Sequence, residues 1–252
     1  MTALLEVKNL CVNIADEDTK ILKDISFTIR KGETVALMGP NGSGKSTLAY
    51  ALMGHPTFEV VSGEVLLEGE NLLEMEPDER ARAGLFLSFQ YPSAVTGVKL
   101  SDFLRAAYNA VKKEKLSVAK FRRLLKEHMQ ELRMDASFAD RYVNDGWSGG
   151  EKKRGEILQL SLLEPKLAVL DETDSGLDID AIRTVSAGVT SALKKNSSMS
   201  AIVITHYKRI LDYIKPDRVL VIHKGRLVEE GGVDLVHKLE EHGYDWVRDK
   251  HD

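Results

Sequence analysis

Four short apolar segments of this sequence each lead into a polar residue or motif suited to handling phosphate, metal or water. The first runs into Gly39-Pro-Asn-Gly-Ser-Gly-Lys-Ser46, the pattern in which glycine N–H groups surround a phosphate and lysine adds charge. The other three segments end at Gln90, at Asp171-Glu172 and at His206. The carboxyl ends of parallel strands lie along one edge of a sheet, where open α/β sheets bind their ligands. We therefore expect the four features to converge on one phosphate.

Residue type assigns a role to each of these groups. Lys45 supplies a point charge to the β- and γ-phosphates, while Ser46, Gln90 and Asp171 are placed to hold Mg²⁺. Glu172 would orient or deprotonate an attacking water, and His206 would hydrogen-bond the γ-phosphate. The predicted catalytic residues are Lys45, Glu172 and His206. The predicted nucleotide-binding residues are Gly39, Pro40, Asn41, Gly42, Ser43, Gly44, Lys45, Ser46, Thr47 and Gln90.

A second glycine-bearing motif, residues 147–153, opens a helix that the sequence predicts to run to about residue 163. Ser148 and Glu151 have the spacing of a capping box. Gly149 and Gly150 in the first turn cost about 1 kcal/mol each in helix propensity, but they leave bare N–H groups at the positive helix end for an anion. One phosphate is not readily enclosed by both this helix and the loop 39–46 of the same chain. This motif therefore predicts a second copy of the chain.

The elements that must position these residues fall into three groups. The segments 33–38, 85–89, 167–170 and 201–205 are apolar throughout, as strands of a helix-covered parallel sheet are. Alternation over 4–14, 21–30 and 64–72, and over 218–223 and 226–230 around a turn at Lys224-Gly225, predicts an antiparallel, partly exposed sheet. Residues 101–139 show helical spacing. The fold class is α/β, with a nucleotide-binding core, an antiparallel β part and an inserted helical part.

Composition narrows the class of protein further. The chain has 252 residues and a formal net charge of -4, which argues against a nucleic-acid partner. Its one cysteine, Cys11, excludes an internal disulfide and cannot alone supply a cysteine-ligated metal cluster. The sequence has no apolar run of about 18 residues and no signal-peptide pattern. We expect a cytoplasmic protein without direct membrane insertion.

The order and content of these motifs resemble those of ABC ATPases. Residues 39–47, 90, 148–151, 171–172, 175–178 and 206 look like the Walker A, Q-loop, signature, Walker B, D-loop and H-loop. The resemblance implies a RecA-like P-loop core, ATP and Mg²⁺ as cofactors, and a single domain over 1–252. In that domain 1–92 and 162–252 form the catalytic core and 93–161 the helical subdomain. It also implies a head-to-tail dimer in which Ser148, Gly149, Gly150 and Glu151 act in trans and Asp178 lies at the seam.

Within that family the sequence is similar to the SufC-type ATPases of the SUF iron–sulfur cluster assembly system. The resemblance rests on residues 89–92, 148–154, 171–180, 205–216 and 239–246. Transporter ATPases more often have Gln in place of Glu151, and Pro-Thr-Ser-Ala in place of residues 173–176. The resemblance implies SufB- and SufD-like scaffold proteins as partners. Two alternatives stay open: the motor of a membrane transporter, and a regulatory ATP-binding module without turnover, against which Glu172 argues.

The chain departs from the family pattern at two places. Trp147 stands where Phe or Leu is expected, which should alter packing only. No aromatic residue lies between Cys11 and Leu22 to stack on adenine, so the base would rest on aliphatic surface near Ile14 or Ile21. We further expect that Lys152 or Lys153 could pair with the catalytic acids in a resting state.

Overall fold

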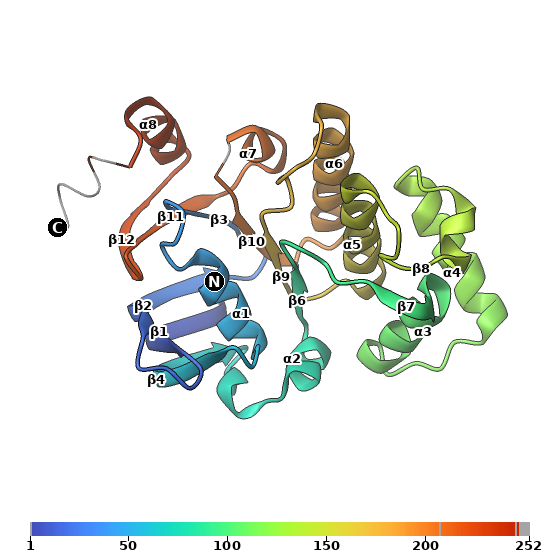
Figure 1. Cartoon of the computed structure of the whole chain (residues 1–252), viewed down its shortest axis with the longest axis horizontal. Helices are drawn as coiled ribbons and strands as arrows, with labels where there is room; N and C mark the ends of the chain where they lie inside the picture. The colour runs from blue at the N-terminus through green and yellow to red at the C-terminus, as the bar shows by residue number, and fades with distance from the viewer. Residues whose placement is uncertain (1, 207, 245, 247–252) are drawn as a thin grey trace.

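A computed structural model describes residues 2–206, 208–244 and 246, with a six-stranded sheet at the centre of the chain (Figure 1). The sheet comprises β3 (Thr34–Met38), β6 (Leu85–Ser88), β9 (Leu167–Asp171), β10 (Ser200–Ile204), β11 (Arg218–His223) and β12 (Arg226–Gly231), in the order β12-β11-β3-β10-β9-β6. All neighbours pair parallel except β11 and β12. The four apolar segments are thus confirmed as adjacent parallel strands.

The prediction for the last two strands was right about the hairpin and wrong about its sheet. β11 and β12 pair antiparallel around Lys224-Gly225, but β11 also pairs parallel with β3 in the central sheet. Five of the six residues of β11 are buried. Its central residues are apolar on both faces, which suits a strand covered on both sides rather than a half-exposed one.

A second sheet is antiparallel and includes the N-terminal strands. Its members are β1 (Ala3–Ile14), β2 (Lys20–Arg30), β4 (Phe58–Leu67) and β5 (Glu70–Asn71), in the order β2-β1-β4-β5. The strands predicted over 4–14 and 21–30 are confirmed. The strand predicted over 64–72 instead begins at Phe58 and ends at Leu67. There Glu68 and Gly69, both with positive φ, turn the chain back.

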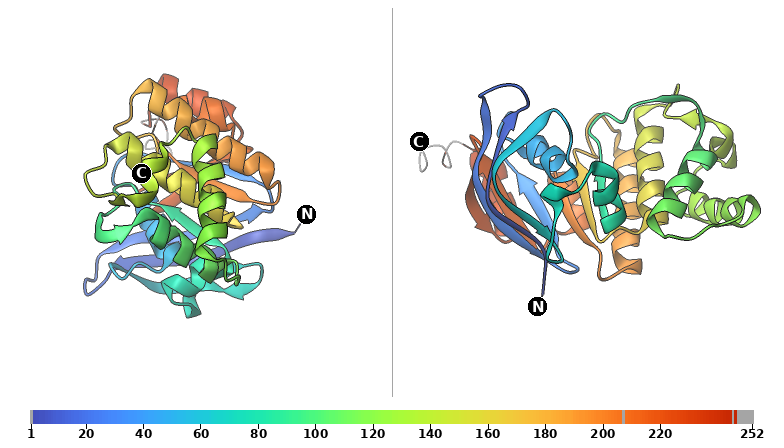
Figure 2. Two further views of the ribbon diagram at one scale, coloured as in Figure 1. Left: turned by 90° about the vertical axis from the view of Figure 1, so that its right-hand side faces the viewer. Right: turned by 90° about the horizontal axis from the view of Figure 1, so that it is seen from below.

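Helix α1 (Lys45–Met53) lies between the two sheets, as the right-hand view of Figure 2 shows. Its Leu48, Ala49 and Leu52 are buried in one apolar cluster with residues of both sheets. On β3, Val35 and Leu37 face this cluster, while Ala36 and Met38 face a second cluster on the opposite side of the sheet. This packing fixes the loop between β3 and α1 at the carboxyl edge of the central sheet.

Helices cover the other face of the central sheet and extend beyond it into a helical lobe (Figure 1). They are α5 (Gly149–Leu163), α6 (Ile179–Lys195), α7 (Lys208–Ile214) and α8 (Asp234–His242). The lobe holds α3 (Leu100–Val111), α4 (Val118–Glu131), β7 (Val95–Lys99), β8 (Tyr142–Val143) and the 3₁₀ helix η2 (Ala136–Asp140); a further helix α2 (Pro77–Ala83) and 3₁₀ turn η1 (Leu72–Glu74) precede β6. The helical block predicted over 101–139 is confirmed. No helix among the described residues is long and apolar enough to cross a membrane.

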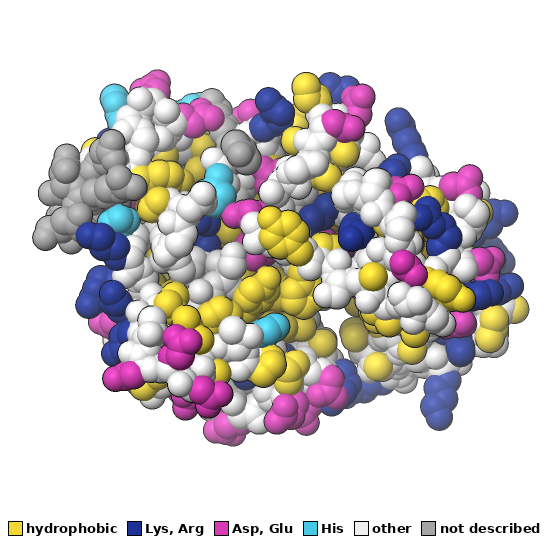
Figure 3. All heavy atoms as spheres, in the orientation of Figure 1, with side chains coloured by type: hydrophobic (Ala, Val, Ile, Leu, Met, Phe, Trp, Pro, Cys, Tyr) yellow, Lys and Arg dark blue, Asp and Glu magenta, His cyan; other side chains and the backbone are white. Residues whose placement is uncertain are grey.

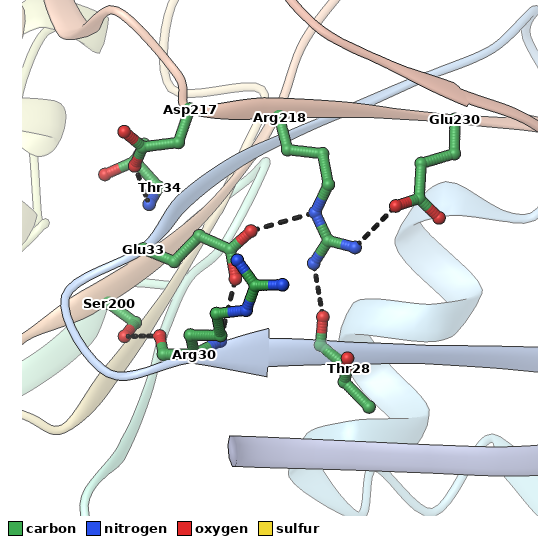
Figure 4. A network of polar contacts seen from close by, with 8 residues as sticks. All are labelled: Thr28, Arg30, Glu33, Thr34, Ser200, Asp217, Arg218 and Glu230. Carbon is green, nitrogen blue, oxygen red and sulfur yellow. Dashed lines mark hydrogen bonds and ion pairs between the residues drawn. The ribbon is translucent and has the colours of Figure 1, made fainter. Parts of the chain in front are cut away.

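One arginine joins the two sheets at the edge where β3 begins (Figure 4). Arg218, at the start of β11, donates to Glu33 Oε1 at 2.8 Å, to Glu230 Oε1 at 2.8 Å and to the carbonyl of Thr28 in β2. Glu33 Oε2 in turn accepts from the N–H of Arg30 at 2.7 Å. The guanidinium therefore holds strands that lie far apart in the sequence.

Candidate active site

The loop between β3 and α1 is folded around the side chain of Lys45. The Nζ atom donates to the carbonyls of Gly39 at 2.9 Å and Pro40 at 3.0 Å. Lys45 is 4% exposed, and burial lowers its pKa to about 8, with Glu172 and Asp171 opposing that shift. A buried ammonium whose hydrogen bonds, in the described part of the chain, go to neutral carbonyls is a site for an anion, because an anion would compensate its charge.

Glycine is required where this loop leaves β3. Gly39 has φ 152°, and a Cβ there would lie 2.1 Å from the carbonyl oxygen of Ile222. The Gly39 N–H donates to the hydroxyl of Tyr244 at 3.2 Å, beyond the end of α8. Further along the loop, Asn41 and Gly42 are exposed to solvent.

Gln90 and His206, which follow two other strands of the sheet, both contact the carboxylate of Glu172. Gln90 Nε2 donates to Glu172 Oε2, and His206 Nε2 lies 2.8 Å from Glu172 Oε1. Glu172 has φ 45°, a left-handed backbone that is uncommon for residues other than glycine. Burial lowers the pKa of His206, and Lys45 lowers it further. In this structure Glu172 is therefore held by two neighbours from different strand ends.

Asp171 and Ser46 form the part of the site suited to a metal ion. Asp171 is fully buried; its Oδ1 accepts from Ser46 Oγ at 3.2 Å, and its Oδ2 has no protein partner among the described residues. Burial raises the pKa of Asp171 to about 6. An orphaned carboxylate oxygen beside a hydroxyl fits Mg²⁺, which takes oxygen ligands and commonly uses one protein carboxylate with substrate phosphates.

The second glycine motif lies at the start of α5, as predicted. Ser148 is the N-cap: its Oγ accepts from the N–H of Glu151, and Glu151 Oε2 accepts from the N–H of Ser148 at 2.7 Å, which completes the capping box. Ser148 and Gly149 are exposed. Together with Gly150, they line a groove of about 450 Å³ shared with residues 176–178, including Asp178. The predicted signature and seam residues thus share one surface.

The aliphatic surface proposed for adenine lies close to the phosphate loop. The carbonyl of Gly225 accepts from the N–H of Lys23 at 2.7 Å, and Ser43 O accepts from the N–H of Gly225 at 2.9 Å. This joins the start of β2, including the half-buried Ile21, to the loop. Ile14 is half-buried at the end of β1. Neither position supplies an aromatic platform.

One set of contacts was not anticipated from the sequence. Lys153 and Glu156 of α5 form a buried ion pair at 3.0 Å. Glu156 Oε1 accepts from the N–H of Phe89 at 2.8 Å, Glu156 Oε2 accepts from Ser88 Oγ at 3.0 Å, and Lys153 Nζ donates to the carbonyl of Phe89. Lys153 therefore forms its ion pair with Glu156 and not, as expected, with Asp171 or Glu172, although its charge lowers the pKa of Asp171. The sequence feature that could have predicted this ion pair is the presence of opposite charges at Lys153 and Glu156, three positions apart on the buried face of a helix.

A loop that encloses a buried lysine, followed at one sheet edge by a metal-type carboxylate and a held glutamate, defines a P-loop nucleotide-binding cassette. Residues 22–175 match the ABC transporter family. The chain is 52% identical to the probable ATP-dependent transporter ycf16 of Cyanophora paradoxa, covering 98% of this chain and 96% of the relative. It is also 52% identical to vegetative protein 296 of Bacillus subtilis (97% and 93% covered) and to a probable ABC transporter ATP-binding protein of Streptococcus pyogenes (96% and 94% covered). The chain belongs to the ABC transporter family and is an ATPase of the ABC type.

Solved structures agree with this fold. The structure of an ATP-binding subunit of an ABC transporter is 27% identical, with a TM-score of 0.78 and coverage of 98% of each chain. The dimeric post-hydrolysis structure of the cassette MJ0796, bound to ADP and Pi, has a TM-score of 0.79 at 20% identity, covering 91% of this chain and 98% of that one. The chain therefore has the RecA-like P-loop fold of ABC cassettes, with its antiparallel β part and helical part.

Proposed function

We propose that two copies of this chain enclose ATP head to tail, and that hydrolysis releases them. The observation that carries this proposal is the groove shared by the exposed start of α5 and the segment 176–178. Bare N–H groups at a helix start favour an anion. The γ-phosphate held at Lys45 of one copy would meet Ser148, Gly149 and Gly150 of the other. In this arrangement Asp178 lies at the seam.

Each side chain of the site has a proposed role in hydrolysis. Lys45 neutralises the β- and γ-phosphates. Ser46, Asp171 and the amide oxygen of Gln90 would hold Mg²⁺, which supplies charge compensation to the phosphates when bound. Glu172, once Gln90 and His206 release it, orients or deprotonates the attacking water, and His206 then contacts the γ-phosphate.

We further propose that the partner is a SufB/SufD-like scaffold and that the motor serves iron–sulfur cluster assembly. Support comes from residues 173–176, which differ from the usual transporter motif. Asp174 is 5% exposed and its Oδ2 accepts from Thr205 Oγ1 at 2.9 Å, beside His206. Gly176 has φ 69°, where alanine would be strained. Two residues of this variant motif thus have a structural role here, since Asp174 bonds Thr205 and Gly176 has a left-handed backbone. Two further positions of the resemblance, Tyr207 and Asp245, lie outside the described residues.

An aromatic surface beside Gln90 is the proposed docking area for the partner. The centre of the Tyr50 ring lies 5.2 Å from the ring centre of His55, 6.0 Å from that of Phe58 and 6.1 Å from that of Phe89. Phe89 is 38% exposed and Tyr91 is 79% exposed. In Figure 3 hydrophobic side chains gather at the centre of the face. Exposed aromatic groups of this kind mark protein contact sites. Residues 93–161 would be the helical subdomain that moves against a core of 1–92 and 162–252.

The motor of a membrane transporter is the second candidate, favoured by the names of several relatives. It would use the same docking surface. Affinity capture from source cells separates the two candidates, with Tyr91→Ala as a bait that should lose the partner and Val118→Ala as an exposed control. Recovery of soluble iron–sulfur scaffold proteins supports cluster assembly. Recovery of an integral membrane permease overturns it.

The head-to-tail mechanism is tested without any partner. Glu172→Gln should accumulate as an ATP-bound dimer by size-exclusion chromatography, because ATP binds but water is not activated. Lys45→Ala should neither bind ATP nor dimerise. A strict monomer of Glu172→Gln in saturating ATP would contradict the enclosure of ATP between two copies.

A further inference from the structure

Arg141, between η2 and β8, contacts the loop before the signature helix at several points. Its Nη2 donates to the carbonyl of Gly146 at 3.2 Å. Its Nη1 lies 3.6 Å from Oε1 of Glu151. Its guanidinium carbon lies 4.3 Å from the ring centre of Phe138 and 5.4 Å from that of Trp147. One side chain thus spans the residues on both sides of Ser148.

The two aromatic rings beside the guanidinium pack against each other and against α5. Trp147 is 6% exposed and meets Phe138 edge-on, with ring centres 4.9 Å apart. A Cβ on Gly155 would lie 2.8 Å from the Trp147 ring. The departure at Trp147 therefore enlarges the aromatic surface on which Arg141 stacks, and a planar guanidinium favours such stacking.

The charge of Arg141 also compensates the negative charge of Glu151 at the start of α5. The carboxylate of Glu151 completes the capping box, but it places a negative charge beside N–H groups that, in the proposed dimer, receive a γ-phosphate. The hydrogen bond from the Ser148 N–H lowers the pKa of Glu151, and Arg141 lowers it further, so the carboxylate stays charged. Without a counter-charge that carboxylate would repel the incoming phosphate.

We propose that Arg141 is a positioning residue for the signature motif, which fixes the start of α5 and neutralises Glu151 so that the motif can receive the nucleotide of a second copy. The proposal rests on the head-to-tail dimer proposed above. Arg141 holds the loop by its Gly146 hydrogen bond and its aromatic stacking, and it holds the helix by its ion pair. None of these contacts involves the phosphate loop of its own chain.

The test uses ATP-driven dimerisation in the Glu172→Gln background. Arg141→Met should raise the dimer dissociation constant about tenfold, the scale of losing a charge-assisted hydrogen bond, while ATP affinity of the monomer changes less than about twofold. Arg123→Met is the matched control, since the Arg123 side chain is 86% exposed and pairs with Glu127 on its own helix, and it should dimerise normally. Adding Glu151→Gln should recover part of the loss caused by Arg141→Met, because the unpaired carboxylate is then gone.

Hydrogen exchange gives a readout that does not require a dimer. Amides of residues 146–151 should exchange about tenfold faster in Arg141→Met, with α1 unchanged. Unchanged exchange there, or dimerisation of Arg141→Met equal to that of its parent, overturns the positioning role. An equal loss of monomer ATP affinity also overturns it, because the effect would then be general damage. If the Glu172→Gln parent itself stays monomeric, the dimer proposal fails first and this inference fails with it.

Discussion

Replacing Glu156 with alanine would leave the Lys153 ammonium buried without its carboxylate. The side chains of both residues are 5% exposed. The same substitution removes the acceptor for the Phe89 N–H and for the Ser88 hydroxyl. Three polar groups would lose a partner at once, in a position where water has little access.

The expected cost is large compared with the whole stability of the fold. Breaking a buried ion pair by removing one partner costs about 3–5 kcal/mol, against a typical total of about 5–15 kcal/mol. We therefore expect Glu156→Ala to lower the free energy of unfolding by about 4 kcal/mol. Urea denaturation followed by circular dichroism measures this difference, provided that the slope of the transition is unchanged.

Two variants make this prediction specific. Glu127→Ala removes the carboxylate of an exposed pair with Arg123 on α4 and should cost about 0.5 kcal/mol at most. The double variant Lys153→Met with Glu156→Leu should recover only the part of the loss that comes from the unpaired ammonium, because the Phe89 N–H and the Ser88 hydroxyl still lack their acceptor. A loss below about 1 kcal/mol for Glu156→Ala would refute the assignment of a buried, mutually dependent pair.

The pair also predicts a pH dependence with a definite sign. Burial raises the pKa of Glu156 above 4.5, while Lys153 and the hydrogen bonds oppose that shift. A carboxyl whose folded pKa is raised binds more protons when folded, so its contribution to stability falls as the pH rises through that pKa. Lys153→Met removes the opposing charge. We expect this variant to lose more stability than the parent as the pH rises above 4.5, and equal losses would contradict this explanation.

Three further predictions concern other parts of the chain. Burial lowers the pKa of His128 below 6.5, so its contribution to stability is complete above pH 6.5 and declines as the pH falls. His128→Gln can still bond Ser161 and should therefore lose less stability on acidification, measured by urea titrations. Arg218→Met should cost about 2–3 kcal/mol in the same assay, since the Glu33 carboxylate, 10% exposed, loses its counter-charge and the Thr28 carbonyl loses its donor. A loss below about 0.5 kcal/mol would refute its structural role. Tyr244→Phe keeps the ring but removes the acceptor for the Gly39 N–H. Steady-state kinetics should show KM for ATP raised about fivefold, with kcat changed by less than about twofold. An unchanged KM would exclude a role of the Tyr244 hydroxyl in holding the phosphate loop.

The sequence was sufficient where a residue's role depends on its near neighbours. The buried strands are apolar on both faces, and the polar groups follow them within one or two residues. The capping box at Ser148 is a matter of three residues, and its two hydrogen bonds are present. Such features are local, so spacing alone predicts them.

The contacts that the sequence did not predict join residues far apart in the chain. Glu156 bonds Ser88 across 68 positions, and Arg218 bonds Glu33 across 185. A charged residue in an amphipathic helix has the same appearance in a sequence whether it faces solvent or a buried partner. The placement of β11 beside β3 was missed for a related reason: its hairpin with β12 is local, whereas its pairing with β3 is not. The hold of Gln90 and His206 on Glu172 likewise depends on where three strand ends lie in space.

Through these long-range contacts, the consecutive residues Phe89 and Gln90 connect helix α5 to the carboxylate of Glu172. The backbone of Phe89 is held on both sides by the Lys153–Glu156 pair of α5, and the next residue, Gln90, bonds Glu172. Movement of α5 relative to the sheet must either break the buried pair, at a cost of several kcal/mol, or carry residues 89–90 along with it. The second route keeps the ion pair, breaks the hydrogen bond between Glu156 and Ser88 of β6, and would move Gln90 relative to Glu172. A partner docked on Phe89, or a second copy docked on the start of α5, would therefore act on the same carboxylate and free it to orient water.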